Sequence, residues 1–80
     1  MKISKGEYCQ FSLKGREDLL KEFGSLELER TFGHKVVRVF RLYDFYVEMI
    51  YDLQRQEIEK IEPVTSLQLL HIYEQLRPSH

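Results

Sequence analysis

The sequence predicts an α+β domain: a four-stranded antiparallel meander flanked by an N-terminal and a C-terminal helix, in the order α-β-β-β-β-α, with both helices on one face. Three observations predict this fold. The 80 residues have the length of one domain. Apolar and polar residues alternate between positions 26 and 62, which is the period of strands. Helix-capping residues stand at Ser12 and Thr65, on either side of that region.

The first helix is expected to run from Ser12, as its N-cap, to about Phe23. Gly24 follows as a stop signal. The residues before it mix small, charged and apolar side chains without a clear period. We therefore expect residues 1–11 to form an N-terminal arm or a short edge strand, and residues 12–78 to form the single domain.

Four strands are expected in the alternating region, separated by residues that favour turns. These separators are Gly33-His34-Lys35, Tyr43-Asp44 and a polar loop at 54–57. Pro63 ends the last strand because it lacks a backbone N–H for the ladder. The expected strands span residues 26–32, 36–42, 45–53 and 58–62.

The lengths of the turns set which side chains share a face. A two-residue turn at Tyr43-Asp44 gathers one apolar set on the face that the helices are expected to cover. This expected core set is Val36, Phe40, Leu42, Phe45, Val47, Met49, Tyr51 and Leu53.

Two loop lengths compete in the first hairpin. A two-residue loop places Glu29 opposite Arg38 but turns the strand's leucines away from the core. A three-residue loop at Gly33-His34-Lys35 places Leu26 and Leu28 on the core face. Burying two leucines is worth about 3–6 kcal/mol, against about 0.2–1 kcal/mol for an exposed ion pair. The three-residue loop is therefore predicted.

The second helix is expected to begin at Thr65 and to stop at Pro78. Thr65 and Gln68 have the spacing of a capping box, in which a hydroxyl is followed three residues later by a Glu or Gln. Its apolar positions are Leu67, Leu69, Leu70, Ile72, Tyr73 and Leu76.

Composition points to a soluble cytoplasmic protein, and the small size is typical of a bacterial one. The net charge of −1 provides no overall field for a polyanion or an anionic membrane. The single Cys9 cannot form an internal disulfide, which fits a reducing compartment. No apolar run approaches the roughly 20 residues of a membrane span, and the N-terminus carries no secretory signal.

Candidates for catalysis or metal binding are few. Glu48 and Asp52 are too loosely spaced for an acid–base pair, and no histidine is positioned by sequence to activate Cys9. His34, His71 and His80 are not at metal-ligand spacing. The sequence therefore predicts a non-enzymatic protein without metal or cofactor.

The face opposite the expected core is half apolar and carries a tyrosine and an arginine, residue types enriched at interfaces. One alternative is an ordinary solvated face with scattered apolar residues. The other is a surface for a second copy or another protein, and we favour an interaction or structural module that forms a homodimer. The interface residues would be Val37, Val39, Arg41, Tyr46, Glu48 and Ile50.

A second hypothesis is a nucleic-acid-binding accessory protein that uses a basic β-hairpin. Between positions 30 and 43 the chain has basic residues and no acid, whereas six acids lie between 44 and 62. Basic residues among aromatics can follow phosphates and stack on bases. The alternative, pairing of basic with acidic side chains across the sheet, is favoured. The basic set is Arg30, His34, Lys35, Arg38 and Arg41.

The segment Leu42-Tyr43-Asp44-Phe45-Tyr46-Val47-Glu48 resembles one found in small uncharacterised bacterial proteins. In those proteins a similar aromatic strand precedes an Ile-x-x-Ile strand and a leucine-rich last helix. The resemblance covers about half the chain and implies a stand-alone domain without an assigned activity. The element order is also similar to that of small bacterial toxins that cleave messenger RNA. Their last strand carries an arginine that residues 58–62 lack.

Overall fold

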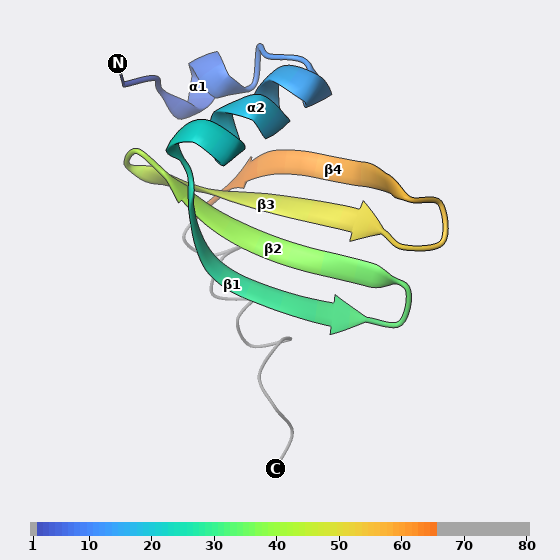
Figure 1. The fold of residues 1–80 in the computed structure, drawn as a ribbon. Coiled ribbons are helices and arrows are strands. Elements are labelled where there is room, and N and C mark those ends of the chain that lie inside the picture. The colour runs from blue at the N-terminus through green and yellow to red at the C-terminus, as the bar shows by residue number, and fades with distance from the viewer. Residues whose placement is uncertain (1, 66–80) are drawn as a thin grey trace.

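Two helices precede a four-stranded antiparallel sheet in the computed structural model, which describes residues 2–65 (Figure 1). The strands follow one another in sequence order, so the predicted α+β class and antiparallel meander are confirmed. The expected helix from Thr65 to Pro78 lies outside the described residues, apart from Thr65 itself. The elements are α1 (Lys5–Tyr8), α2 (Leu13–Phe23), β1 (Ser25–Phe32), β2 (Lys35–Leu42), β3 (Phe45–Asp52) and β4 (Glu57–Val64).

The short helix α1 replaces the expected N-terminal arm or edge strand. It is closed by a capping box: the Ser4 hydroxyl accepts from the backbone N–H of Glu7 at 3.1 Å, and the Glu7 carboxylate accepts from the Ser4 N–H at 2.9 Å. The second bond holds the pKa of Glu7 below its usual value. The Ser-x-x-Glu spacing was visible in the sequence and would have predicted this helix start.

Helix α2 follows the prediction closely at both ends. The Ser12 hydroxyl caps it by accepting from the N–H of Gly15 at 3.1 Å. Gly24 ends it, but with extended backbone angles (φ −82°, ψ 151°) rather than the left-handed ones of a common helix stop. A Cβ at Gly24 would lie 2.6 Å from the carbonyl oxygen of Leu20. Glycine is therefore needed here for close approach of the backbone.

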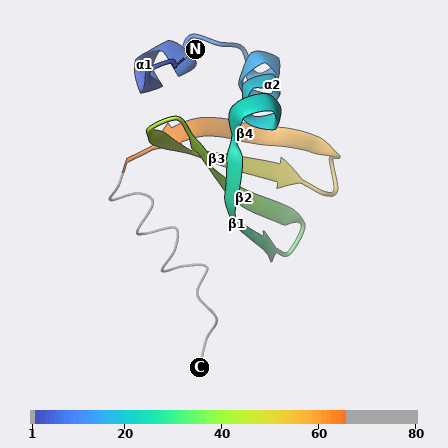
Figure 2. The same ribbon diagram turned by 60° about the vertical axis from the view of Figure 1, so that its left-hand side comes forward.

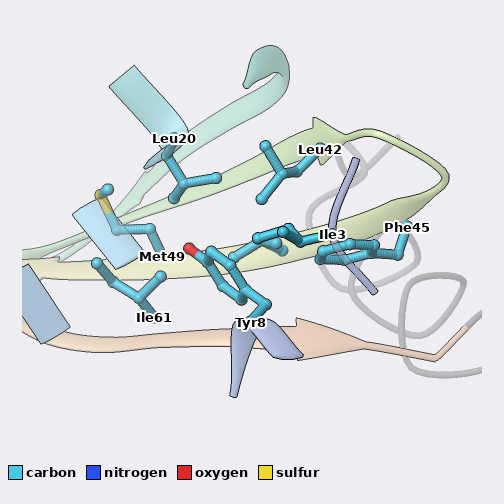
Figure 3. Packing of buried hydrophobic residues seen from close by; sticks show 8 residues of the cluster. Ile3, Tyr8, Leu20, Leu42, Phe45, Met49 and Ile61 are labelled. Carbon is cyan, nitrogen blue, oxygen red and sulfur yellow. The ribbon is translucent and has the colours of Figure 1, made fainter. Parts of the chain in front are cut away.

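The hydrophobic core lies between the helices and one face of the sheet, which we call the core face (Figure 3). Tyr8 of α1 and Leu20 of α2 are almost fully buried there. Figure 3 shows their side chains directed toward the apolar side chains of β2, β3 and β4. The strand members of this cluster are Leu42, Phe45, Val47, Met49 and Ile61.

The predicted register of the central hairpin is confirmed. Leu42 lies opposite Phe45 and Val36 opposite Tyr51, across the two-residue turn at Tyr43-Asp44. Of the expected core set, only Leu53 lies outside a strand, where it is about half exposed. The face opposite the core face, which we call the second face, carries Val37, Val39, Arg41, Tyr46, Glu48 and Ile50.

The predicted three-residue loop in the first hairpin is wrong. The loop has two residues, Gly33 and His34, so that Phe32 pairs with Lys35 and Glu29 pairs with Arg38. Gly33 supplies a positive φ of 54° at the first turn position. A β-bulge between Leu26 and Leu28 then shifts the register. The two-residue loop gives the Glu29–Arg38 pair, and the bulge keeps Leu26 on the core face in spite of that loop length.

The bulge separates two leucines that were expected on the same face. Leu26 pairs with Phe40 and stays on the core face, whereas Leu28 pairs with Val39 and lies on the second face. Leu26 remains 51% exposed despite its position, because it lies on an edge strand. Burial of Leu26 and Leu28 together therefore does not determine the length of the loop in the first hairpin.

The last strand runs through Pro63, contrary to the expectation that proline ends it. Pro63 pairs with Val47, inside a strand that continues to Val64. β4 is an edge strand, so a proline whose missing N–H would face outward costs no ladder hydrogen bond. The carbonyl of Ile61, two residues earlier, is also directed outward, since it accepts from the Arg16 guanidinium at 2.6 Å.

Candidate interaction surface

The second face is only partly open. Val39 is 0% exposed and Glu48 is 8% exposed, whereas Arg41 is exposed and Val37, Tyr46 and Ile50 are half-buried. The structure thus places all six residues of the expected interface on one face but buries two of them. Val39 and Glu48 cannot serve as contact residues on an open sheet face.

Glu48 forms an ion pair with Lys60 on the second face. Its carboxylate lies 3.0 Å from the ammonium of Lys60, which also lies 3.7 Å from Glu62. Glu48 and Glu62 are direct cross-strand neighbours, so Lys60 lies between two like charges. The hydrogen bond to Glu48 raises the pKa of Lys60. This arrangement stabilises the sheet rather than offering a free charge to a ligand.

The basic residues of the first hairpin are distributed over both faces. Arg38 lies on the core face and pairs with Glu29 across the β1–β2 ladder. Lys35 lies on the second face, with its ammonium 2.7 Å from the carboxylate of Glu59. Acid–base pairing across the sheet is therefore what the structure shows for these two cations, as the favoured alternative predicted.

The remaining members of the basic set are also separated. His34 lies in the turn, with its Nε2 3.8 Å from the carboxylate of Asp52. Arg30 donates to the backbone carbonyl of Glu29 at 2.8 Å. Arg41 is exposed on the second face, several residues along β2. No continuous basic stripe of the kind that follows a phosphate backbone results.

Asp52 is buried for a structural reason. Its Oδ1 accepts from the backbone N–H groups of Gln54 and Arg55 at 3.0 and 3.1 Å, which closes the β3–β4 turn. These bonds, with the Arg55 bond as the largest cause, hold the pKa of Asp52 below its usual value. Glu48 and Asp52 thus have separate partners: the Lys60 ammonium for Glu48 and the backbone of the β3–β4 turn for Asp52.

The edge strand β1 is the most open part of the sheet. Every residue of it is exposed except Leu28, which is half-buried. The exposed apolar residues Leu26 (51%) and Phe32 (49%) lie near its two ends. In Figures 1 and 2, β1 forms the edge opposite to β4. Arg30, in the basic set, is the one residue of β1 that the sequence assigned to a surface, because the predicted three-residue loop placed Leu26 and Leu28 in the core.

The other edge of the sheet is protected. On β4, the guanidinium of Arg16 occupies the outward carbonyl of Ile61, and Pro63 has no N–H to offer. Charged side chains stand at four positions of the strand, Glu57, Glu59, Lys60 and Glu62. These are the features by which natural sheets prevent edge pairing. The two edges of the sheet therefore differ in their capacity to accept another strand.

Other candidate sites are weak among residues 2–65. A shallow hollow of about 470 Å³ lies between the N-terminal segment and the β2–β3 turn, where Lys2 and Asp44 form an exposed ion pair at 3.1 Å. No group of three or more His, Cys, Asp or Glu residues in that range could hold a metal ion. Cys9 is exposed, in the connection between the helices.

Comparison with protein-family models, with curated proteins and with solved structures finds no match to this chain. In the part of the chain that the structure describes, no helix is both long and apolar enough to span a membrane. The resemblance to small bacterial proteins therefore stays a prediction.

Proposed function

We propose that the protein is a non-catalytic interaction module that self-associates by pairing β1 with the β1 strand of a second copy. The observation that carries this proposal is the exposure of an eight-residue strand at the edge of the sheet. Such an edge presents a row of backbone N–H and C=O groups that another strand can satisfy. A symmetric dimer is the commonest way in which a single surface is used.

Hairpin geometry indicates which backbone groups of β1 face outward. In a two-residue hairpin, the residues that flank the loop direct their backbone groups toward each other, and this direction alternates along the strand. Phe32 flanks the loop, so Thr31 and Glu29 direct theirs outward. The Glu29 carbonyl is consistent with this, because it accepts from a side chain rather than from β2.

Antiparallel pairing centred on Arg30 uses these outward groups. It brings Glu29 of one copy opposite Thr31 of the other, so that both pairs exchange backbone hydrogen bonds. On the second face it brings Leu28 opposite Phe32, an apolar cross-strand pair at each end of the contact. The sequence of β1 is thus self-complementary in this register, except at its centre.

The centre of the contact is unfavourable, because Arg30 meets its own counterpart. The two guanidinium groups repel each other through solvent, and salt screens such repulsion. Association through β1 should therefore be weak at low ionic strength and stronger as salt is added. Binding of a basic hairpin to nucleic acid has the opposite dependence, since salt weakens contacts with phosphates. No observation in the structure favours the nucleic-acid hypothesis.

Sedimentation equilibrium at micromolar concentration tests the proposal on the wild type and two variants. Thr31→Pro removes an outward N–H without touching the ladder to β2, and is expected to give a monomer. Thr31→Val is the matched control, since it keeps the backbone donor and the side-chain shape; it should associate as the wild type does. Unfolding midpoints of all three proteins confirm that the fold is retained.

A wild-type protein that stays monomeric at all salt concentrations would overturn the proposal. Ile50→Asp distinguishes association through the β1 edge from association through the second face, because Ile50 lies on the second face and not on the β1 edge. Loss of the dimer in Ile50→Asp, with Thr31→Pro still associating, would assign the interface to the second face instead.

A further inference from the structure

Arg30 is the one cation of strand β1, and its charge is not neutralised by the surrounding residues. Its guanidinium forms no ion pair with a carboxylate of residues 2–65 and donates instead to the backbone carbonyl of Glu29 at 2.8 Å. On the neighbouring strand, Arg30 lies opposite Val37, which is apolar. Arg30 is also exposed. The open edge of the sheet therefore carries an uncompensated positive charge.

Two other cations of the same hairpin already have acidic partners. Arg38 pairs with Glu29 across the β1–β2 ladder on the core face. The ammonium of Lys35 lies 2.7 Å from the carboxylate of Glu59. A strand added beside β1 would therefore meet Arg30 as the cation that its own side chains can neutralise.

Apolar side chains flank Arg30 on the same face of the strand. Because side chains alternate along a strand, Leu28 and Phe32 lie on the second face with Arg30, two residues to either side of it. Phe32 is 49% exposed and Leu28 is half-buried. The edge thus presents an apolar, a cationic and again an apolar side chain in a row. A facing strand matches this row best with an apolar, an acidic and an apolar residue.

We infer that the β1 edge binds an extended acidic segment of another protein, with apolar, acidic and apolar residues at alternate positions. This inference rests on the proposed pairing through β1, and it names a partner that fits the edge better than a second copy does. Two copies bring Arg30 against Arg30, whereas such a segment brings a carboxylate against the guanidinium. Backbone hydrogen bonds supply affinity in strand addition, and the alternate side chains supply selectivity.

Backbone geometry brings the two charges close together. Glu29 and Thr31 direct their backbone groups outward, so an antiparallel segment bonds to these two residues and leaves Arg30 in a non-hydrogen-bonded pair between them. Side chains approach most closely in such pairs, whose Cα atoms are about 4.5 Å apart. Glu27 is exposed at the bulge and would repel a second acid opposite it. The segment that fits therefore has one acid, at its centre.

Two synthetic peptides test the inference by NMR titration of the isotope-labelled full chain. The first is Thr-Val-Thr-Glu-Thr-Val-Thr, and the second has lysine in place of the glutamate. At low salt, where two copies repel each other most, the wild type should bind the glutamate peptide about 5-fold more tightly than the lysine peptide. The amide signals of Glu29 and Thr31 should shift on binding. Added salt should weaken binding of the glutamate peptide, whereas it strengthens pairing of two copies.

Arg30→Glu is the matched variant, because it reverses the charge and leaves the outward backbone groups in place. It should prefer the lysine peptide by a similar factor, and Thr31→Pro should bind neither peptide. Equal binding of both peptides by the wild type, or a glutamate preference retained in Arg30→Glu, would overturn the acidic partner and leave pairing of two copies unaffected. So would binding of neither peptide by a protein that self-associates. A wild type that binds the glutamate peptide but stays monomeric would support the acidic partner and overturn self-association alone.

Discussion

Arg16 connects three parts of the chain through one guanidinium group. It donates to the carbonyls of Cys9 at 2.7 Å, Phe11 at 3.1 Å and Ile61 at 2.6 Å, and lies over the ring of Tyr8. Its own carbonyl accepts from the Tyr8 hydroxyl at 2.9 Å. The planar fork of arginine is what allows three acceptors to be met at once.

Replacing Arg16 should therefore destabilise the fold even where the charge is kept. Hydrogen bonds from charged groups contribute about 1.5–3 kcal/mol each when partly buried, and since they are not additive we expect a loss of about 2–4 kcal/mol for Arg16→Ala. Arg16→Lys should recover less than half of it, because one ammonium cannot reach three separated carbonyls. Urea unfolding measures both losses. Equal stability of Arg16→Lys and wild type would contradict this role.

Tyr8 gives the fold a dependence on alkaline pH. Burial raises the pKa of its phenol above the ordinary value near 10. The neutral form is favoured in the folded state, so this contribution is complete below pH 10 and is lost as pH rises toward the folded-state pKa. The free energy of unfolding should fall by up to about 1.4 kcal/mol per pH unit above pH 10.

Urea titrations between pH 9 and 11 test that dependence. Tyr8→Phe should be less stable than wild type at pH 8, because it loses the bond to the Arg16 carbonyl, but should show a shallower fall at high pH. Tyr46→Phe is the control, since it leaves Tyr8 in place and should keep the wild-type slope. A Tyr8→Phe slope equal to that of wild type would show that other groups dominate.

At the scale of elements, the β1–β2 hairpin depends on the conformation of its turn. Gly33 has a φ of 54°, and no atom lies within 4 Å of the position that a Cβ would take. A side chain at position 33 would therefore destabilise the fold only through backbone strain. That strain is about 1–2 kcal/mol for an L-residue with left-handed backbone angles.

Gly33→Ala is accordingly expected to lower the free energy of unfolding by about that amount, without changing the core. His34→Ala, at the next turn position, should have a smaller effect, because His34 has no positive φ and its side chain is about half exposed. The comparison is made by urea unfolding of both variants and of wild type. Equal losses in the two variants would mean that the turn is not set by Gly33.

The same hairpin shows how far sequence patterns could predict an element. The turn position, the strands on either side and the Glu29–Arg38 alternative were all visible in the sequence. The β-bulge after Leu26 was not, because a bulge has no fixed residue signature and is decided by how both strands fit the whole sheet. The predicted loop length and the predicted position of Leu28 on the core face are therefore both wrong.

For the whole molecule, the salt dependence of self-association is the sharpest expectation. Pairing through β1 places Arg30 against its counterpart, so added sodium chloride should strengthen the dimer. Arg30→Thr removes that repulsion and should associate more tightly at low salt, with little salt dependence left. Sedimentation at several ionic strengths measures both. A dimer that weakens as salt is added would contradict a contact centred on Arg30.

Local sequence patterns were sufficient to predict the α+β meander, helix α2 with its Ser12 cap, and the register of the central hairpin. These depend on local capping, turn length and alternation, which act over a few residues. Local patterns did not predict that Tyr8 and Ile3 enter the core, that Leu28 faces away from it, or that Val39 and Glu48 are buried. Burial depends on which elements lie against each face, and that choice involves contacts between residues far apart in the chain.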